Sequence, residues 1–240
     1  MRRPEAALIL IISSLMTVPA IAGPYEDASN AYKHGDYKTS FRIIKPLAEQ
    51  GLTKAQFDLG AMYDNGEGVP QNFAEAMKWY RKAADQGHAT ALLNLGVMFT
   101  IGHGVPQDYA EAMKWFRKAA DQGDASAQYN LGGMYYKGQG VRKDYAEAVK
   151  WFGKAADQGE AIAMRNLGVM YESGEGVRKD YVMAHMWFNL AASRNPSSEI
   201  GRRNENVKDR DNLASKMTPA QIAEAQKLAL EWKSKKGRTR

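Results

Sequence analysis

The stretch ALLNLGVMFTIGHGVPQDYAEAMKWFRKAADQG, from Ala91 to Gly123, sets the fold of this chain. Its first third places apolar residues at spacings of i, i+3, i+4, i+7 and i+8, which form one face of an α-helix. Two glycines and Pro106 then indicate a turn. Asp108, followed three residues later by Glu111, is typical of a helix start in which Asp caps a free N–H and Glu reaches back. A second amphipathic helix follows and ends at Gly123, which suits a left-handed cap.

The same pattern returns at a fixed step of 36 residues. The Leu-Gly pair, the Gln-Gly pair and the tryptophan each occur in four copies at that step, the tryptophans being Trp79, Trp115, Trp151 and Trp187. A fixed period in this range, without strand-like alternation, indicates stacked units that bury one another's apolar faces. We therefore predict an all-α chain that forms a right-handed α-solenoid of stacked helical hairpins.

The four copies share the pattern A-x-x-N-L-G-x-M-Y-x-x-G-x-G-V-x-x-D-Y-x-x-A-x-x-W-F-x-K-A-A-x-Q-G. This pattern resembles the Sel1-like repeat, a relative of the tetratricopeptide repeat. The resemblance covers residues 54–194 as four repeats, at 54–87, 88–123, 124–159 and 160–194. Residues 23–53 resemble a divergent leading hairpin. Similarity to this family implies a scaffold or adaptor of the bacterial envelope that binds another protein or peptide, is not an enzyme and needs no cofactor.

The amino terminus has the layout of a secretory signal peptide. Arg2 and Arg3 precede an apolar run that is short for a membrane span, and the small-residue triplet Ala20-Ile21-Ala22 fits a cleavage site. We predict a signal over residues 1–22, cleaved after Ala22, and a mature chain that is periplasmic or secreted. An uncleaved membrane anchor remains the alternative.

Charge and composition narrow the possible chemistry. The chain has 240 residues, a formal net charge of +6 and no cysteine, which excludes disulfides and thiol chemistry. Residues 201–240 hold 11 Lys and Arg against 5 Asp and Glu, whereas residues 23–200 hold 20 against 21. The basic tail is either a weak contact for an anionic surface or a solubilising end. Nucleic acid is not an expected partner, because export separates the chain from it and no recognition module is present.

The fourth repeat departs from the other three at charged positions. A glutamate and two lysines of the pattern become Met183, Met186 and Leu190. An apolar face in a terminal repeat needs a cover, and residues 195–240 are the sequence left to supply it. We predict capping helices there, a short one near residues 206–215 and one that begins at Thr218-Pro219. The apolar stripe of the second consists of Ile222, Ala225, Ala229 and Trp232.

No residue set in the sequence selects a catalytic or metal site. The four histidines, His34, His88, His103 and His185, lie in different units without ligand spacing. The carboxylates mostly recur as helix caps or alternate with lysine. The rival interpretation is a β-lactam-binding or β-lactam-hydrolysing enzyme, an activity associated with family members that carry paired cysteines. This chain has none of those cysteines and no S-x-x-K motif.

Partner binding is expected in the concave groove formed by the first helix of each repeat. Residues that vary from copy to copy there are free of packing constraints. They lie two positions before and five positions after the leucine of the Leu-Gly pair: Phe57, Asp64, Leu93, Thr100, Tyr129, Tyr136, Arg165 and Glu172. Tyr129 and Tyr136 are the strongest candidates, because aromatic side chains often dominate interfaces. Phe57 and Leu93 suit inter-repeat packing equally well.

Overall fold

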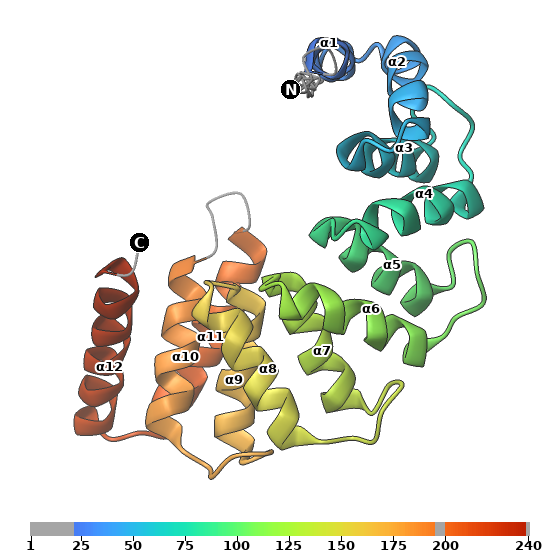
Figure 1. Cartoon of the computed structure of the whole chain (residues 1–240). Helices are drawn as coiled ribbons and strands as arrows, with labels where there is room; N and C mark the ends of the chain where they lie inside the picture. The colour runs from blue at the N-terminus through green and yellow to red at the C-terminus, as the bar shows by residue number, and fades with distance from the viewer. Residues whose placement is uncertain (1–21, 195–199, 239–240) are drawn as a thin grey trace, which may run out of the picture.

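The computed structural model describes residues 22–194 and 200–238, and these described residues form twelve α-helices and no strand. The helices follow one another along an open arc (Figure 1). They are α1 (Ala22–Lys33), α2 (Tyr37–Glu49), α3 (Thr53–Asn65), α4 (Phe73–Asp85), α5 (Ala89–Ile101), α6 (Tyr109–Asp121), α7 (Ala125–Lys137), α8 (Tyr145–Asp157), α9 (Ala161–Ser173), α10 (Tyr181–Arg194), α11 (Ile200–Ala214) and α12 (Pro219–Arg238). The predicted all-α solenoid of stacked hairpins is confirmed.

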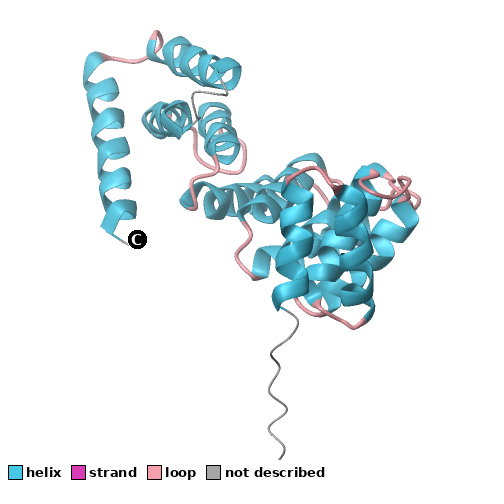
Figure 2. Ribbon diagram, turned by 90° about the horizontal axis from the view of Figure 1, so that it is seen from above, coloured by secondary structure: helices cyan, strands magenta, loops and turns pink. Residues whose placement is uncertain are grey.

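Consecutive helices pack on one another from α1 to α11, and loops join the helices from α1 to α10 (Figure 2). In each repeat, the helix with the Leu-Gly pair is here called the first helix; these are α3, α5, α7 and α9. The helix with the tryptophan is the second helix; these are α4, α6, α8 and α10. The hairpin of α1 and α2 precedes the first repeat and packs on α3.

The glycine of the Leu-Gly pair allows the two helices of a repeat to approach closely. A Cβ added to Gly132 in α7 would lie 2.6 Å from Cδ1 of Phe152 in α8, well inside the carbon–carbon contact distance of about 3.5 Å. Phe152 directly follows the tryptophan of its repeat and is buried. The Leu-Gly signature therefore reflects an aromatic ring packed directly on the backbone of the first helix.

The start of a second helix is capped as predicted, but the capping box is incomplete. In α6 the carboxylate of Asp108 accepts hydrogen bonds from the N–H groups of Ala110 and Glu111. The predicted return bond from Glu111 is wrong, because the Asp108 N–H already donates to the carbonyl of Phe99 at 2.9 Å. Glu111 forms a surface ion pair with Lys114 instead. The bond from Asp108 to Phe99 closes the loop onto the first helix. It uses the Asp108 N–H, which is the donor that a complete capping box would require.

Cations cover the tryptophan rings between repeats. Lys154 Nζ lies 3.9 Å from the centroid of the Trp151 ring, and the guanidinium carbon of Arg117 lies 4.7 Å from it. A cation over an indole face is attractive. Around the tryptophan of the last repeat both cation positions are uncharged, because they hold Gly153 and Leu190. That tryptophan therefore needs a different cover.

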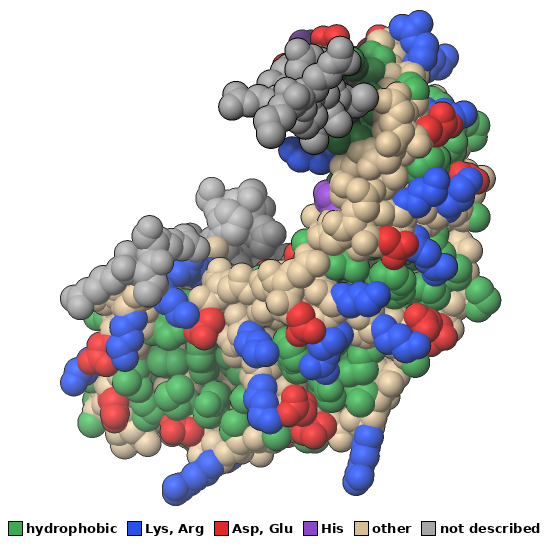
Figure 3. All heavy atoms as spheres, in the orientation of Figure 1, with side chains coloured by type: hydrophobic (Ala, Val, Ile, Leu, Met, Phe, Trp, Pro, Cys, Tyr) green, Lys and Arg blue, Asp and Glu red, His purple; other side chains and the backbone are tan. Residues whose placement is uncertain are grey.

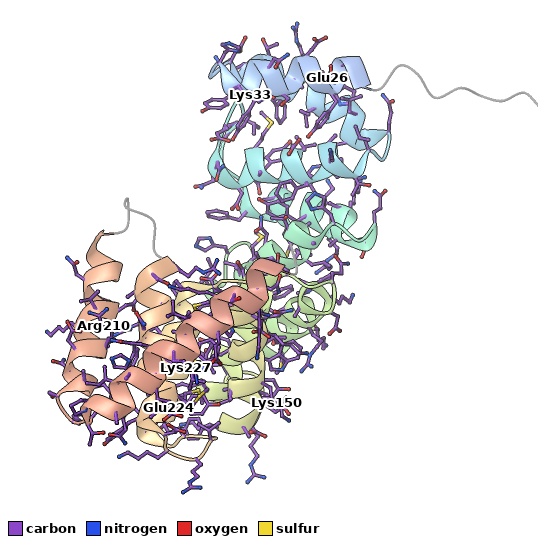
Figure 4. All side chains as sticks on the ribbon, turned by 90° about the vertical axis from the view of Figure 1, so that its left-hand side faces the viewer. Glu26, Lys33, Lys150, Arg210, Glu224 and Lys227 are labelled. Carbon is purple, nitrogen blue, oxygen red and sulfur yellow. The ribbon has the colours of Figure 1, made fainter. Side chains whose placement is uncertain are left out.

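Helix α12 supplies this cover. Its Trp232 meets the ring of Trp187, and its Ala229 packs in the same apolar cluster as Met186 and Leu190. Met186 is 5 % exposed and Leu190 is fully buried. Seen from this end of the array in Figure 4, α12 lies in front of the repeats. The predicted capping helix is confirmed.

Both carboxy-terminal helices dock on α10, on different faces. Helix α12 begins as the sequence predicts, since Gln221 donates its N–H to Thr218 Oγ1 and accepts the Thr218 N–H at 2.9 Å. Helix α11 begins six residues earlier than the short helix expected at 206–215. Leu213 of α11 packs in one buried cluster with Ala184 and Phe188 of α10. The two helices therefore cover more of the last repeat than a single cap would.

The predicted signal peptide lies almost wholly outside the described residues, because residues 1–21 are not described. Ala22, after which cleavage is expected, is the first residue of α1. Among the described residues, no helix combines the length and the apolar character that a membrane crossing requires.

Candidate binding surface

A cavity of about 360 Å³ opens between the first helices α5, α7 and α9. The buried rings of Phe116 and Phe152, from the second helices, lie at its base. Its lining includes three of the residues predicted for the groove: Thr100 from α5 and Tyr129 and Tyr136 from α7. The two tyrosines are seven residues apart, so two turns of α7 bring them to one site.

Neighbouring rings and a hydrogen bond fix both tyrosines in place. The ring of Tyr129 lies 5.8 Å from Phe152, and the ring of Tyr136 lies 5.1 Å from Tyr145, measured between centroids. The Tyr136 hydroxyl donates to Glu175 Oε2 at 3.0 Å. Burial, helped by this bond, raises the pKa of Tyr136, so the hydroxyl stays protonated at neutral pH. Rings held in this way lose little entropy when a partner binds.

Exposed apolar side chains occur on α5 and α9, two of the helices that line the cavity. Val97 and Ile101 of α5 are 38 % and 51 % exposed, and Val169 of α9 is 38 % exposed and lines the cavity. Helix α5 contains no charged residue. By contrast, the face of the molecule in Figure 3 carries Lys and Arg side chains interspersed with Asp and Glu. An exposed apolar patch on a well-packed array marks a contact surface.

These three residues are not among those predicted from the sequence, although a signal was present. Val97 and Val169 occupy the same repeat position, two residues after the leucine of the Leu-Gly pair. Ile101 lies one turn beyond Val97 on α5. The uncharged character of α5 is visible in the sequence, and it distinguishes this first helix from the other three.

The chain itself engages two of the predicted groove residues. Arg165 Nε donates to Asp209 Oδ2 at 2.7 Å, and Lys216 Nζ donates to Glu172 Oε1 at 3.0 Å. Asp209 belongs to α11, and Lys216 lies two residues after the end of that helix. Helix α11 therefore runs along the first-helix side of α9. Arg165 and Glu172 are thus paired within the chain, a pairing that the sequence did not predict.

The remaining predicted residues make contacts within the array, either between repeats or within one repeat. The ring of Phe57 stacks on His88 with centroids 4.4 Å apart. Asp64 accepts a hydrogen bond from the hydroxyl of Tyr80 at 3.3 Å. Leu93 is half-buried against the core of the second repeat. For Phe57 and Leu93 the structure thus favours the inter-repeat packing role that the sequence left open.

The described residues contain no group of three His, Asp or Glu side chains able to hold a metal ion.

A second, smaller cavity lies at the leading hairpin and is lined by a hydrogen-bonded carboxyl group, that of Asp58. Asp58 accepts a hydrogen bond from the Tyr25 hydroxyl at 2.6 Å. Burial raises the pKa of Asp58, and the Tyr25 bond and the nearby His88 and Lys54 oppose that rise. We interpret this pair as a polar link between α1 and α3.

Stacked two-helix units of this kind define a helical tandem-repeat protein. The Sel1 repeat matches residues 53–88, 89–124, 125–160 and 161–196. The chain therefore belongs to the Sel1 repeat family, whose repeats generally mediate protein–protein interactions.

Two crystal structures extend the similarity beyond the four repeats. A protective antigen present in uropathogenic Escherichia coli strains is 33 % identical, with a TM-score of 0.77 over 89 % of this chain and 45 % of that chain. A Sel1 repeat protein from Oxalobacter formigenes is 31 % identical, with a TM-score of 0.71 over 89 % of this chain and 84 % of that one.

A shorter match is to a fungal protein. Forty-eight residues of the chain are 44 % identical to the chitin synthase regulator SKT5 of Saccharomyces cerevisiae, which is 20 % of this chain and 7 % of that protein. The chain thus spans a small part of the yeast protein and less than half of the Escherichia coli antigen.

Proposed function

We propose that this chain is a scaffold or adaptor that binds a segment of another protein in the groove between α5, α7 and α9. The observation that carries the proposal is the cavity lined by Tyr129 and Tyr136, together with the exposed Val97 and Ile101 of α5, a helix whose Thr100 lines the same cavity. Aromatic side chains held rigidly beside a hollow are the usual anchors of protein interfaces.

The binding site that we propose is confined to the middle of the array. Packing engages Phe57 and Asp64 at one end, and α11 engages Arg165 and Glu172 at the other. Between these ends the first-helix surface offers Thr100 and the two tyrosines together with the exposed valines and Ile101. A partner segment therefore meets an apolar centre flanked by polar ends, as in other protein interfaces.

We also propose that the protein acts in the bacterial envelope, as a periplasmic or secreted adaptor. The basic start, short apolar run and small-residue triplet of residues 1–22 support export. The absence of cysteine suits this placement, because the packing of the repeats stabilises the chain without disulfides.

Chemical cross-linking in intact bacteria, followed by affinity purification and mass spectrometry, tests the proposal. The unchanged chain and a Tyr32→Ala control should recover the same partner, because Tyr32 lies on α1, away from the groove. The Tyr129→Ala/Tyr136→Ala variant should lose the partner while keeping the helical circular dichroism of the unchanged chain. Recovery by the double variant would place the site elsewhere, and turnover of a β-lactam by the purified chain would favour the enzyme interpretation.

A further inference from the structure

The smaller cavity at the leading hairpin lies apart from the proposed partner site. Its volume is about 240 Å³, below the range of about 300–1,000 Å³ that is typical of sites for drug-sized ligands. Helices α1, α2 and α3 supply its lining, and they lie at the opposite end of the arc from α12 (Figure 1). A ligand of this cavity is therefore small, and it does not compete with a partner bound between α5, α7 and α9.

One carboxylate in this cavity lacks a cationic partner. Among the described residues that line the cavity, Asp58 alone carries a charge. It is half-buried, forms no ion pair with a described residue, and accepts one hydrogen bond, from the Tyr25 hydroxyl at 2.6 Å. That bond favours the ionised form of the carboxyl group, whereas burial disfavours it and raises its pKa. A cationic ligand would compensate the charge that the fold buries.

The charged groups around the cavity do not supply this cation. Lys54, one turn before Asp58 on α3, is exposed and forms no ion pair with a described residue. Burial lowers the pKa of the nearby His88 below its ordinary value of 6.5, so this base is mostly neutral at neutral pH. Glu67 adds a second carboxylate, which accepts the Tyr32 hydroxyl at 2.6 Å. An incoming cation therefore meets a net negative charge.

Two serine hydroxyls in the lining are available to a hydrogen-bond donor. Ser40 of α2 is 2 % exposed, lines the cavity, and makes no side-chain hydrogen bond with a described residue. Ser29 of α1 lines the cavity as well, and its hydroxyl makes no hydrogen bond with a described residue either. A buried hydroxyl normally has a partner. A primary ammonium group has three N–H donors, enough for the Asp58 carboxylate and both hydroxyls.

The rest of the lining suits the carbon atoms of such a ligand. It is aromatic or aliphatic and consists of Tyr25, Tyr32, Ile44, Phe57, Ala61 and Met62. Aromatic rings attract a cation, and apolar side chains favour the burial of an alkyl stem. Counter-charge, hydrogen-bond acceptors and an apolar wall thus occur together in one small cavity.

We propose that this cavity binds a primary ammonium group on a short alkyl stem, as a small free amine carries it. The carboxylate of Asp58 supplies the counter-charge, the hydroxyls of Ser29 and Ser40 accept N–H hydrogen bonds, and the aromatic rings pack on the stem. A lysine side chain of another protein carries the same group, so the experiment has to separate the two sources.

Chemical-shift titration of the ¹⁵N-labelled full chain with three small probes tests the ammonium site. Butylammonium has the charge and the N–H donors, tetramethylammonium has the charge without the donors, and butanol has the alkyl stem without the charge. We expect butylammonium to bind with a dissociation constant of about 1 mM or lower, with shifts in α1, α2 and α3. Tetramethylammonium should bind more weakly, and butanol should not saturate.

A fourth probe, N-acetyl-lysine amide, separates the two sources of the ammonium group. It carries the same group on a four-carbon stem, attached to peptide amides. Equal or weaker binding than that of butylammonium would support the free amine. Tighter binding would overturn the free amine in favour of a lysine side chain.

Asp58→Asn keeps the shape of the side chain and should weaken butylammonium binding by about tenfold or more, the usual effect of losing a charged hydrogen bond. Asp85→Asn makes the same change at an exposed position of α4 and should not alter the affinity. Ser40→Ala should weaken butylammonium by about threefold or more and leave tetramethylammonium unchanged, because that cation has no N–H to donate.

Several outcomes would overturn the inference. Equal affinities for butylammonium and butanol, shifts confined to helices other than α1, α2 and α3, or an unchanged affinity in Asp58→Asn would each contradict it. The spectrum of each variant also shows whether it is folded. If Asp58→Asn did not fold, Ser40→Ala would decide, since equal losses for the two cations would contradict the hydrogen bond to the ammonium group. None of these outcomes bears on the groove between α5, α7 and α9.

Discussion

Trp187 of the last repeat lies edge-on to Trp232 of α12, with ring centroids 6.1 Å apart and ring planes inclined at 71°. In the preceding repeat a lysine and an arginine cover the equivalent ring of Trp151. The array therefore ends by replacing a polar contact between repeats with an aromatic contact to a capping helix. A terminal repeat needs such a cover, because no further repeat buries its face.

Trp232→Ala should destabilise the capped end by about 2 kcal/mol, less than a fully buried tryptophan would cost, because this ring is half-buried. Urea unfolding measures the change, and hydrogen exchange should show faster exchange in α12 than in α5. Leu230→Ala is the control, since Leu230 is on the same helix and 67 % exposed. Equal losses in the two variants would mean that the tryptophan contact does not hold α12.

Removal of residues 197–240 should lower both the melting temperature and the solubility of the chain. Met186 and Leu190, now 5 % and 0 % exposed, would face water, and a new apolar patch promotes association. Differential scanning calorimetry and light scattering measure the two effects. An unchanged melting curve would refute the capping role.

Gly132→Ala should destabilise the chain by about 1–3 kcal/mol, because the added Cβ would lie 2.6 Å from the buried Phe152 ring. Gly133→Ala is a matched control one residue along the same helix, where an added Cβ meets nothing within 4 Å. That control should stabilise α7 by up to about 1 kcal/mol through helix propensity. Thermal unfolding of both variants should therefore show shifts of opposite sign, and two shifts of the same sign would contradict the packing account.

The interface between α10 and α11 should weaken in acid. His185 is 3 % exposed, and its Nδ1 has no hydrogen-bond partner among the described residues. Burial lowers the pKa of His185 below its ordinary value of 6.5; among the charged groups of α11 that face it, Arg210 adds to this effect and Asp211 opposes it. Below that ordinary value the unfolded chain binds a proton that the folded chain excludes, so stability falls as the pH drops.

The loss of unfolding free energy should approach, at most, about 1.4 kcal/mol for each pH unit below the ordinary histidine pKa of 6.5. Urea unfolding at about pH 7.5 and pH 5.5 should show a smaller loss for His185→Gln than for the unchanged chain. His34→Gln, a change at an exposed histidine, should keep the full loss. If His185→Gln kept it as well, another group would be responsible.

The regular part of this fold is predictable from sequence because each repeated residue has a local or nearest-neighbour role. The Leu-Gly pair, the tryptophan and the capping Asp108 contact residues within their own repeat or the next one. The apolar residues of the fourth repeat even predict a cap, since Met186 and Leu190 break a charged pattern. Local pattern and packing agree at these positions.

Prediction from the sequence fails where a residue has two possible partners or a partner that is distant in the chain. Glu111 matches a capping box, but the loop geometry gives its intended donor to another carbonyl. Arg165 and Glu172 look like free groove residues, and their partners lie 44 residues away in and next to a helix that has no counterpart in the repeats. Exposure of Val97 depends on where the neighbouring first helices lie, which no local pattern gives.

Site-specific photo-cross-linking tests the central claim, that a protein partner lies on the groove between the first helices. A photo-reactive amino acid is placed at Val97 in the groove or at Leu230 on the outer side of α12, in bacteria that express the full chain. We predict a discrete partner adduct from position 97, none from position 230, and loss of the adduct when Tyr129→Ala and Tyr136→Ala are added. Adducts from position 230 alone, or an adduct from position 97 that survives both tyrosine changes, would contradict it.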